Sequence, residues 1–209
     1  MNTARPSPAS TPPDSGVEGN SRLTSANGML LLALLAVEGF SIISVRRMIT
    51  LHVFLGIVLI GPVLLKTGST MYRFARYYRG ARPYLGKGPP HWLLRVLGPV
   101  VILSSLMLLG TGVGLLAVKP ADPGGLLRAH KASFVIWVAV MTLHVLGHLK
   151  GAALTTWWEL REVGRSAPPG RVPRLSLIAL ALVLGIATAT ALFPSASSWT
   201  SGSAAGQDR

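Results

Sequence analysis

Five long apolar runs constrain what this chain can fold into more than any other feature of its sequence. They cover roughly residues 29–45, 49–66, 93–118, 132–149 and 175–193. Each approaches the ~20 residues that an α-helix needs to cross the hydrocarbon core of a bilayer. Backbone polar groups in lipid must pair within the protein, so such runs predict helices. We therefore predict an all-α, multi-pass transmembrane helical bundle. Its first four helices form the core, and the fifth, which lacks ionisable residues, is peripheral.

Composition supports a membrane protein and narrows the chemistry available to it. Half of the 209 residues are hydrophobic, only 13% are charged, and the mean hydropathy is +0.50. The chain has no cysteine, which excludes disulfides, thiolate metal sites, iron–sulfur clusters and cysteine nucleophiles. Any metal or cofactor must therefore be held by histidine, methionine, carboxylate or backbone groups.

The two ends of the chain differ in composition from the apolar region between them. Residues 1–28 are rich in Pro, Ser, Thr, Gly and Asn. A segment with so little apolar surface does not offset the entropy lost on ordering. We predict a disordered N-terminal tail over 1–28, a transmembrane domain over 29–193 and a flexible C-terminal tail over 194–209.

The basic residues predict how the chain is oriented. There are 20 Lys and Arg against 7 Asp and Glu, and 14 of the 20 fall in the N-terminal tail, in 66–95 or in 150–174. Cytoplasmic segments collect Lys and Arg, so we expect the cell membrane, with the N-terminus in the cytoplasm and the C-terminus outside. Arginines and aromatics alternate in 71–79, a mixture that can also stack nucleic-acid bases. We interpret it as a helix end against anionic membrane lipid, and we expect no nucleic acid partner.

Titratable side chains within the apolar runs are the candidates for function. A charge in a membrane is costly, so each such residue is a functional hypothesis. All five histidines lie in or beside the runs, and none lies in either tail. The candidates are Glu38, His52, His91, His130, His144 and His148.

Helical spacing relates these histidines to one another. His144 follows His130 by 14 residues, which places it about 40° from the same azimuth and about 21 Å along the helix. His148 continues the same stripe. His52 is expected at the outer end of the second helix, at the depth of His130 on the fourth. Two imidazoles on facing helices at one depth are what the iron of a b-type heme requires.

Three segments carry a resemblance to a known family. They are L-H-V-F-L-G at 51–56, L-R-A-H-K-A-S-F at 127–134 and L-H-V-L-G-H at 143–148. Here the sequence resembles the small bacterial membrane cytochromes b, which include hydrogenase-type cytochrome b subunits and ferric-reductase-like transmembrane domains. The resemblance covers roughly residues 30–150. It implies a four-helix bundle with one or two hemes b that moves electrons between quinone or quinol, heme and a redox partner protein.

The resemblance also implies a set of ligands. His52 and His130 resemble the outer heme pair, and His144 resembles one ligand of an inner heme. The sequence departs from the family because the residue 14 positions after His52 is Lys66. His91 lies on the expected side for that role but follows two prolines. The inner heme is therefore less well supplied with ligands than the outer one.

The remaining candidates each have two interpretations. Arg46, Arg47, Arg128 and Lys131 either bind heme propionates or only anchor helix ends at the membrane surface. Glu38 either relays protons to a quinone or is a neutral, protonated core residue paired with a histidine or hydroxyl. His144 and His148, spaced i and i+4, can also share another metal such as zinc or copper, although no local carboxylate or thiol completes that site.

The function predicted from these features is electron transfer by an integral membrane b-type cytochrome. Such a protein is an electron-transfer subunit rather than a stand-alone catalyst, because the heme iron supplies the redox chemistry. The alternative is a heme-free structural or assembly subunit of a larger membrane complex. The glycines within 110–114 do not form a nucleotide loop, since no strand precedes them; they favour close packing or room for a flat macrocycle.

Overall fold

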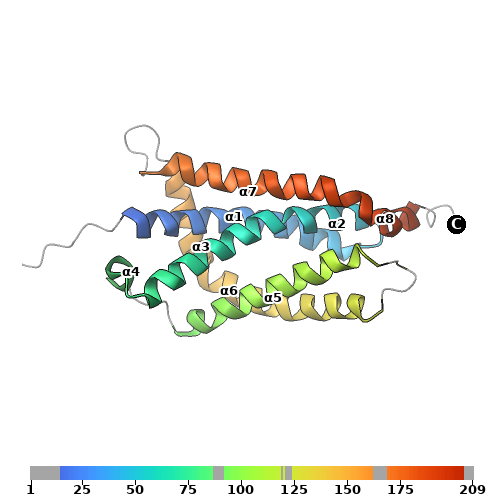
Figure 1. The fold of residues 1–209 in the computed structure, drawn as a ribbon, viewed down its shortest axis with the longest axis horizontal. Coiled ribbons are helices and arrows are strands. Elements are labelled where there is room, and N and C mark those ends of the chain that lie inside the picture. The colour runs from blue at the N-terminus through green and yellow to red at the C-terminus, as the bar shows by residue number, and fades with distance from the viewer. Residues whose placement is uncertain (1–14, 87–91, 119, 121–123, 162–168, 205–209) are drawn as a thin grey trace, which may run out of the picture.

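The computed structural model describes residues 15–86, 92–118, 120, 124–161 and 169–204, and in these ranges it contains helices and no strand (Figure 1). The predicted all-α fold is confirmed. The elements are α1 (Ser15–Ile43), α2 (Ile49–Val58), α3 (Ile60–Tyr78), α4 (Arg82–Gly86), α5 (Trp92–Leu115), α6 (Gly124–Arg161), α7 (Arg171–Leu192), the 3-10 turn η2 (Phe193–Ala196) and α8 (Ser197–Ala204).

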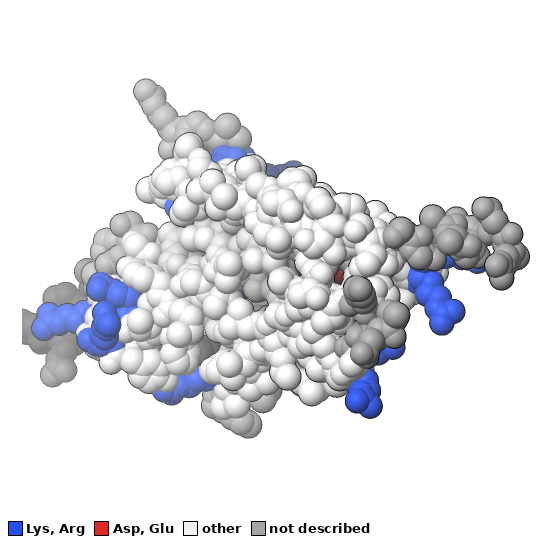
Figure 2. All heavy atoms as spheres, turned by 45° about the vertical axis from the view of Figure 1, so that its right-hand side comes forward, with Lys and Arg blue, Asp and Glu red and all other residues white. Residues whose placement is uncertain are grey.

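Five stretches of helix are long and apolar enough to cross a membrane. They are Gly16–Ile43, Ile49–Tyr78, Arg95–Leu115, Gly124–Arg161 and Arg171–Thr200. Figure 2 shows Lys and Arg side chains at the ends of the molecule and a broad uncharged surface between them. Many large apolar side chains on that surface are exposed, as expected where lipid replaces water. The described chain is thus a multi-pass membrane bundle.

The helices surround an interior space on one side of the bundle. α5 and α6 form an antiparallel pair, α1 contacts α6, α3 and α2, and α7 packs on α2 and α3 (Figure 1). α7 therefore lies on the opposite side of the α1–α3 layer from α5. No residue of α7 lines the cavity described below.

The first half of α1 corrects one prediction. Residues 15–28, predicted as part of a disordered tail, are helical and contact α3. The Asn27 side-chain amide donates a hydrogen bond of 2.8 Å to the Pro62 carbonyl, and the hydroxyls of Thr24 and Ser69 lie 3.0 Å apart. Small polar side chains hold helices together in membranes. The polar side chains of this segment, which we expected to be hydrated in a disordered tail, instead form hydrogen bonds between α1 and α3.

Two helices extend well beyond the apolar runs that predicted them. α6 contains 38 residues and is therefore about 57 Å long, whereas the hydrocarbon core is about 30 Å thick. The run 132–149 marks only the middle of this helix. α3 likewise continues to Tyr78, beyond the predicted limit at residue 66. Hydropathy locates the segment of a helix that lipid surrounds, but it does not locate the ends of the helix.

The C-terminal segment corrects a second prediction. Residues 194–204, predicted as part of a flexible tail, form most of η2 and all of α8. The Trp199 indole N–H lies 2.9 Å from the Leu115 carbonyl oxygen and 3.1 Å from that of Val118. The last carbonyls of a helix have no partner within it. Trp199 supplies one at the end of α5, which ties α8 to the bundle.

A proline and two glycines set the contact between the second span and α7. Pro62 has no N–H, so the Val58 carbonyl lacks its helical partner at the break between α2 and α3. A Cβ added to Gly185 would overlap this carbonyl oxygen. A Cβ added to Gly61 would overlap the carbonyl oxygen of Ala181. The two backbones touch here, and glycine is required on both sides.

Candidate functional site

A cavity of about 980 Å³ lies between α1, α2, α3, α5 and α6. This volume is at the upper end of the range of about 300–1,000 Å³ for small-molecule and cofactor sites. Its wall is mostly apolar. All four histidines that the structure describes line it, together with Glu38 and Lys66. The titratable residues singled out in the sequence therefore face one common space.

His52 on α2 and His130 on α6 lie together at one end of the cavity. Their ring centres are 6.4 Å apart and the ring planes are inclined by 71°. Two imidazoles on opposite sides of one metal ion, with bonds of about 2 Å, have ring centres about 6 Å apart. The structure thus brings these two predicted residues to a separation that suits one axial pair.

Glu38 holds the ring of His52. Its Oε1 lies 2.6 Å from Nδ1 of His52, and the glutamate is only 8% exposed. The Ser41 hydroxyl also lies 3.3 Å from this Nδ1, but it donates its hydrogen to the Glu38 backbone carbonyl at 2.6 Å. An ionised carboxylate only accepts hydrogen bonds, so opposite an ionised Glu38 the Nδ1 carries the hydrogen and Nε2 keeps its lone pair. Of the two partners predicted for a buried Glu38, a histidine or a hydroxyl, the histidine is the nearer in the structure.

Thr111 on α5 holds the ring of His130 in the same way. Its hydroxyl lies 3.1 Å from Nδ1 of His130, and 2.8 and 3.0 Å from the carbonyls of Met107 and Leu108. The hydroxyl has one hydrogen, which one of these carbonyls accepts, so the Thr111 oxygen accepts the Nδ1 hydrogen. A Cβ on Gly112 would lie 3.2 Å from Cε1 of His130. Glycine at this position makes room for the ring.

In this arrangement Nδ1 of each histidine is engaged by a neighbouring group, which leaves Nε2 available. Histidines that ligate metals commonly donate their other N–H to a carboxylate, a carbonyl or a similar acceptor. Sequence reasoning did not identify Thr111 or Ser41 as these partners. A signal existed for Thr111 alone, because it lies among the glycines of 110–114 for which the sequence indicated close packing.

The opposite end of the cavity contains His144 and His148. Their ring centres are 4.7 Å apart, and Nδ1 of His144 is buried without a hydrogen-bond partner in the described structure. Lys66 also lines the cavity and donates a 2.6 Å hydrogen bond to the Thr24 carbonyl. Among the described residues, no histidine on another helix joins His144 at this end. His91, the other sequence candidate, lies outside the described residues.

A different metal at His144 and His148 finds no further ligand. Within the described ranges, no group of three or more His, Cys, Asp or Glu side chains is placed to hold an ion. A two-histidine site without a third protein ligand is incomplete for zinc or copper. A heme differs in this respect, because its macrocycle supplies four ligands and the protein supplies only two axial ones.

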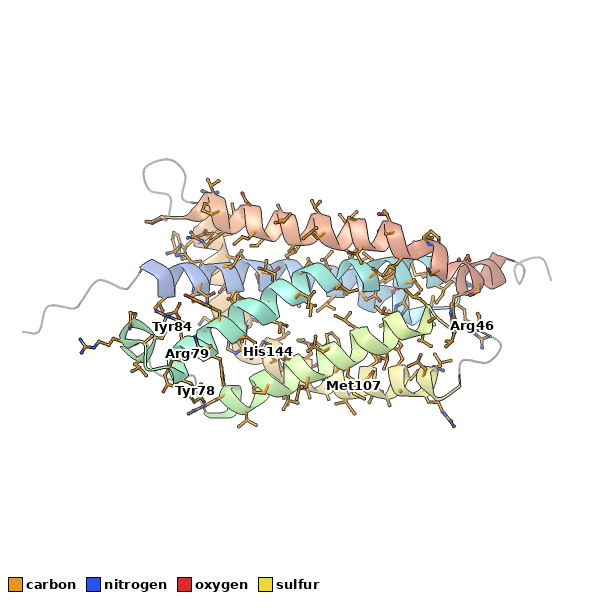
Figure 3. All side chains as sticks on the ribbon, in the orientation of Figure 1. Arg46, Tyr78, Arg79, Tyr84, Met107 and His144 are labelled. Atoms are coloured by element: carbon orange, nitrogen blue, oxygen red, sulfur yellow. The ribbon has the colours of Figure 1, made fainter. Side chains whose placement is uncertain are left out.

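The four predicted propionate partners divide into two pairs. All four are exposed, but Arg46 and Lys131 also line the cavity, whereas Arg47 and Arg128 do not. Figure 3 shows Arg46 at the end of the bundle opposite Tyr78, Arg79 and Tyr84. Only Arg46 and Lys131 are therefore positioned to meet an anionic group inside the cavity.

Comparison of this chain with protein-family models, with curated proteins and with solved structures finds no match.

Proposed function

We propose that this protein is an integral membrane b-type cytochrome in which His52 and His130 hold one heme b between α2 and α6. In this proposal it is an electron-transfer subunit that works between a membrane donor, such as quinol, and a redox partner protein. One observation carries the proposal. Two imidazoles from facing helices lie 6.4 Å apart, and the Nδ1 of each is engaged so that Nε2 remains available.

Three features of the cavity fit a heme. Its volume of about 980 Å³ and its apolar wall suit a large flat macrocycle. Gly112 leaves space directly beside His130. Arg46 and Lys131 supply positive charge on the wall, which suits the carboxylates of such a group.

The heme iron, when bound, would supply one-electron redox chemistry that no side chain of this protein provides. The residues of the chain orient the axial imidazoles and form the apolar cavity. Glu38 and Thr111 fix the rotation of the two imidazoles, so the ligand nitrogens are ordered before binding. The apolar wall excludes water from the cavity, which strengthens the electrostatic effect of nearby charges.

Heme content tests this proposal directly. The protein is produced in heme-replete cells and purified in mild detergent, and its reduced-minus-oxidised spectrum is recorded. We expect Soret and α-band signals and a single heme per chain. His52→Ala and His130→Ala each remove an axial ligand and are expected to abolish the signals, while His148→Ala, a matched change at the other end of the cavity, retains them.

Folding of each variant is checked by its elution on gel filtration and by its helical circular dichroism. A heme-replete wild-type preparation without these bands contradicts the proposal, as do full signals in both His52→Ala and His130→Ala. Stoichiometric copurification of other membrane proteins with a heme-free chain would instead support the structural or assembly subunit.

The orientation of the chain is a separate proposal, with the Arg79 end in the cytoplasm and the Arg47 end outside. The absence of cysteine from the chain permits a simple test. Arg47→Cys in intact cells is expected to react with a membrane-impermeant maleimide, and Arg79→Cys only after permeabilisation. Both side chains are exposed, so a difference in labelling reports the side of the membrane and not burial within the protein. The reverse labelling pattern would overturn this orientation.

A further inference from the structure

Two chemically unlike groups hold the paired imidazoles. Nδ1 of His52 meets a carboxylate at 2.6 Å, and Nδ1 of His130 meets a hydroxyl at 3.1 Å. A carboxylate brings a full negative charge to its histidine, whereas the hydroxyl of Thr111 brings none. The site is thus electrostatically asymmetric across the space between the two rings.

We propose that Glu38 is a positioning residue that lowers the reduction potential of the heme through His52. This inference rests on the proposed function. A carboxylate that accepts the Nδ1 hydrogen makes the ring a stronger electron donor at Nε2. A more basic axial ligand and a nearby negative charge both favour the oxidised iron, which carries one more positive charge than the reduced iron. Thr111 orients His130 without adding this charge.

The burial of Glu38 strengthens the electrostatic effect of its carboxylate on His52. The residue is buried at 8% exposure, so solvent screens it little. The charge therefore acts on His52 through a direct hydrogen bond of 2.6 Å.

Potentiometric titration of the heme-loaded protein tests the inference. Loss of an outer-shell partner of a metal ligand typically changes binding or activity about 10–100-fold. For Glu38→Gln we expect at least a tenfold higher ratio of reduced to oxidised heme at a fixed potential, which is a midpoint about 59 mV more positive. Glu18→Gln removes the same charge near the other end of α1, and its midpoint is expected to match the wild type. Thr111→Val is expected to shift the midpoint less than Glu38→Gln does.

A midpoint in Glu38→Gln equal to that of the wild type, with heme retained, overturns the inference and leaves the proposed function intact. Should Glu38→Gln bind no heme, Glu38→Asp replaces it in the titration. The shorter aspartate weakens the hydrogen bond, so its midpoint is also expected to be more positive, and an unchanged midpoint overturns the inference.

A second measurement needs no heme. The ¹⁵N spectrum of histidine-labelled, heme-free protein distinguishes the two imidazole tautomers. We expect His52 to carry its hydrogen on Nδ1 in the wild type and to lose this preference in Glu38→Leu, which offers no acceptor. A wild-type protein that binds no heme defeats the proposed function and, with it, the effect of Glu38 on a reduction potential. An unchanged His52 tautomer in Glu38→Leu defeats the positioning role whether or not heme is bound.

Discussion

Replacing Glu159 by alanine is expected to lower the free energy of unfolding by about 3–5 kcal/mol, because it leaves a buried guanidinium without its carboxylate. Glu159 on α6 is 1% exposed and Arg174 on α7 is 8% exposed. Nε and Nη2 of Arg174 donate hydrogen bonds of 2.9 and 2.5 Å to one Glu159 oxygen, and Arg22 of α1 donates one of 3.2 Å to the other. One carboxylate therefore joins three helices.

Unfolding in detergent by SDS titration, followed by circular dichroism, measures this effect. Glu18→Ala is the control, because it breaks a partly exposed i, i+4 pair with Arg22 and is expected to cost less than about 1 kcal/mol. Replacing both Glu159 and Arg174 by leucine removes both buried charges, so its cost is expected to be well below that of Glu159→Ala. Equal losses in the Glu159→Ala and Glu18→Ala proteins would show that the cluster is not structural.

Placing a leucine at position 185 is expected to detach α7 from the second span. Even a Cβ at Gly185 overlaps the Val58 carbonyl oxygen, and a backbone atom, unlike the tip of a flexible side chain, has little freedom to move away. Overpacking typically costs about 1–3 kcal/mol and sometimes more. We expect Gly185→Ala to lie within this range and Gly185→Leu to exceed it.

A cysteine pair reports on this docking, since the chain has no cysteine of its own. The rings of Phe54 and Phe193 have centres 6.0 Å apart, so Phe54→Cys and Phe193→Cys are expected to be joined by a short bifunctional reagent. Gly185→Leu should abolish this crosslink. Gly110→Ala is the matched glycine control, because nothing lies within 4 Å of its added Cβ, and it should keep both crosslink and stability. Crosslinking of the Gly185→Leu protein at the wild-type rate would contradict the proposed contact.

Hydropathy predicted the five spans because a helix that crosses the bilayer needs about 20 predominantly apolar residues, and such a run is visible in the sequence. Hydropathy did not predict the parts of the helices that extend beyond the apolar runs. Residues 15–28 are polar, yet Asn27 and Thr24 use their polarity to bind α3. In the C-terminal segment, Trp199 satisfies carbonyls that belong to a helix more than 80 residues earlier. Contacts of this kind depend on neighbours in space, which composition does not reveal.

The candidate site was predictable in part. The predicted topology placed His52 and His130 at one depth, and the structure brings their rings together. Their partners Glu38 and Thr111 depend on how α1 and α5 are rotated about their own axes. That rotation follows from packing around the whole cavity, and no periodicity in a single helix reports it. For the same reason, no pattern in the sequence indicated that Glu159 would meet Arg174.

The length of α6 places His130 and Glu159 on a single rod. They are 29 residues apart, so about 44 Å of helix separates them. The rod is pinned at one end by Arg174 and held at the other by Thr111. A tilt of about 2° at the pinned end would displace the far end by about 1.5 Å over this length. The ion cluster at Glu159 and the imidazole of His130 thus share one continuous helix, so the orientation of that helix is common to both ends of the molecule.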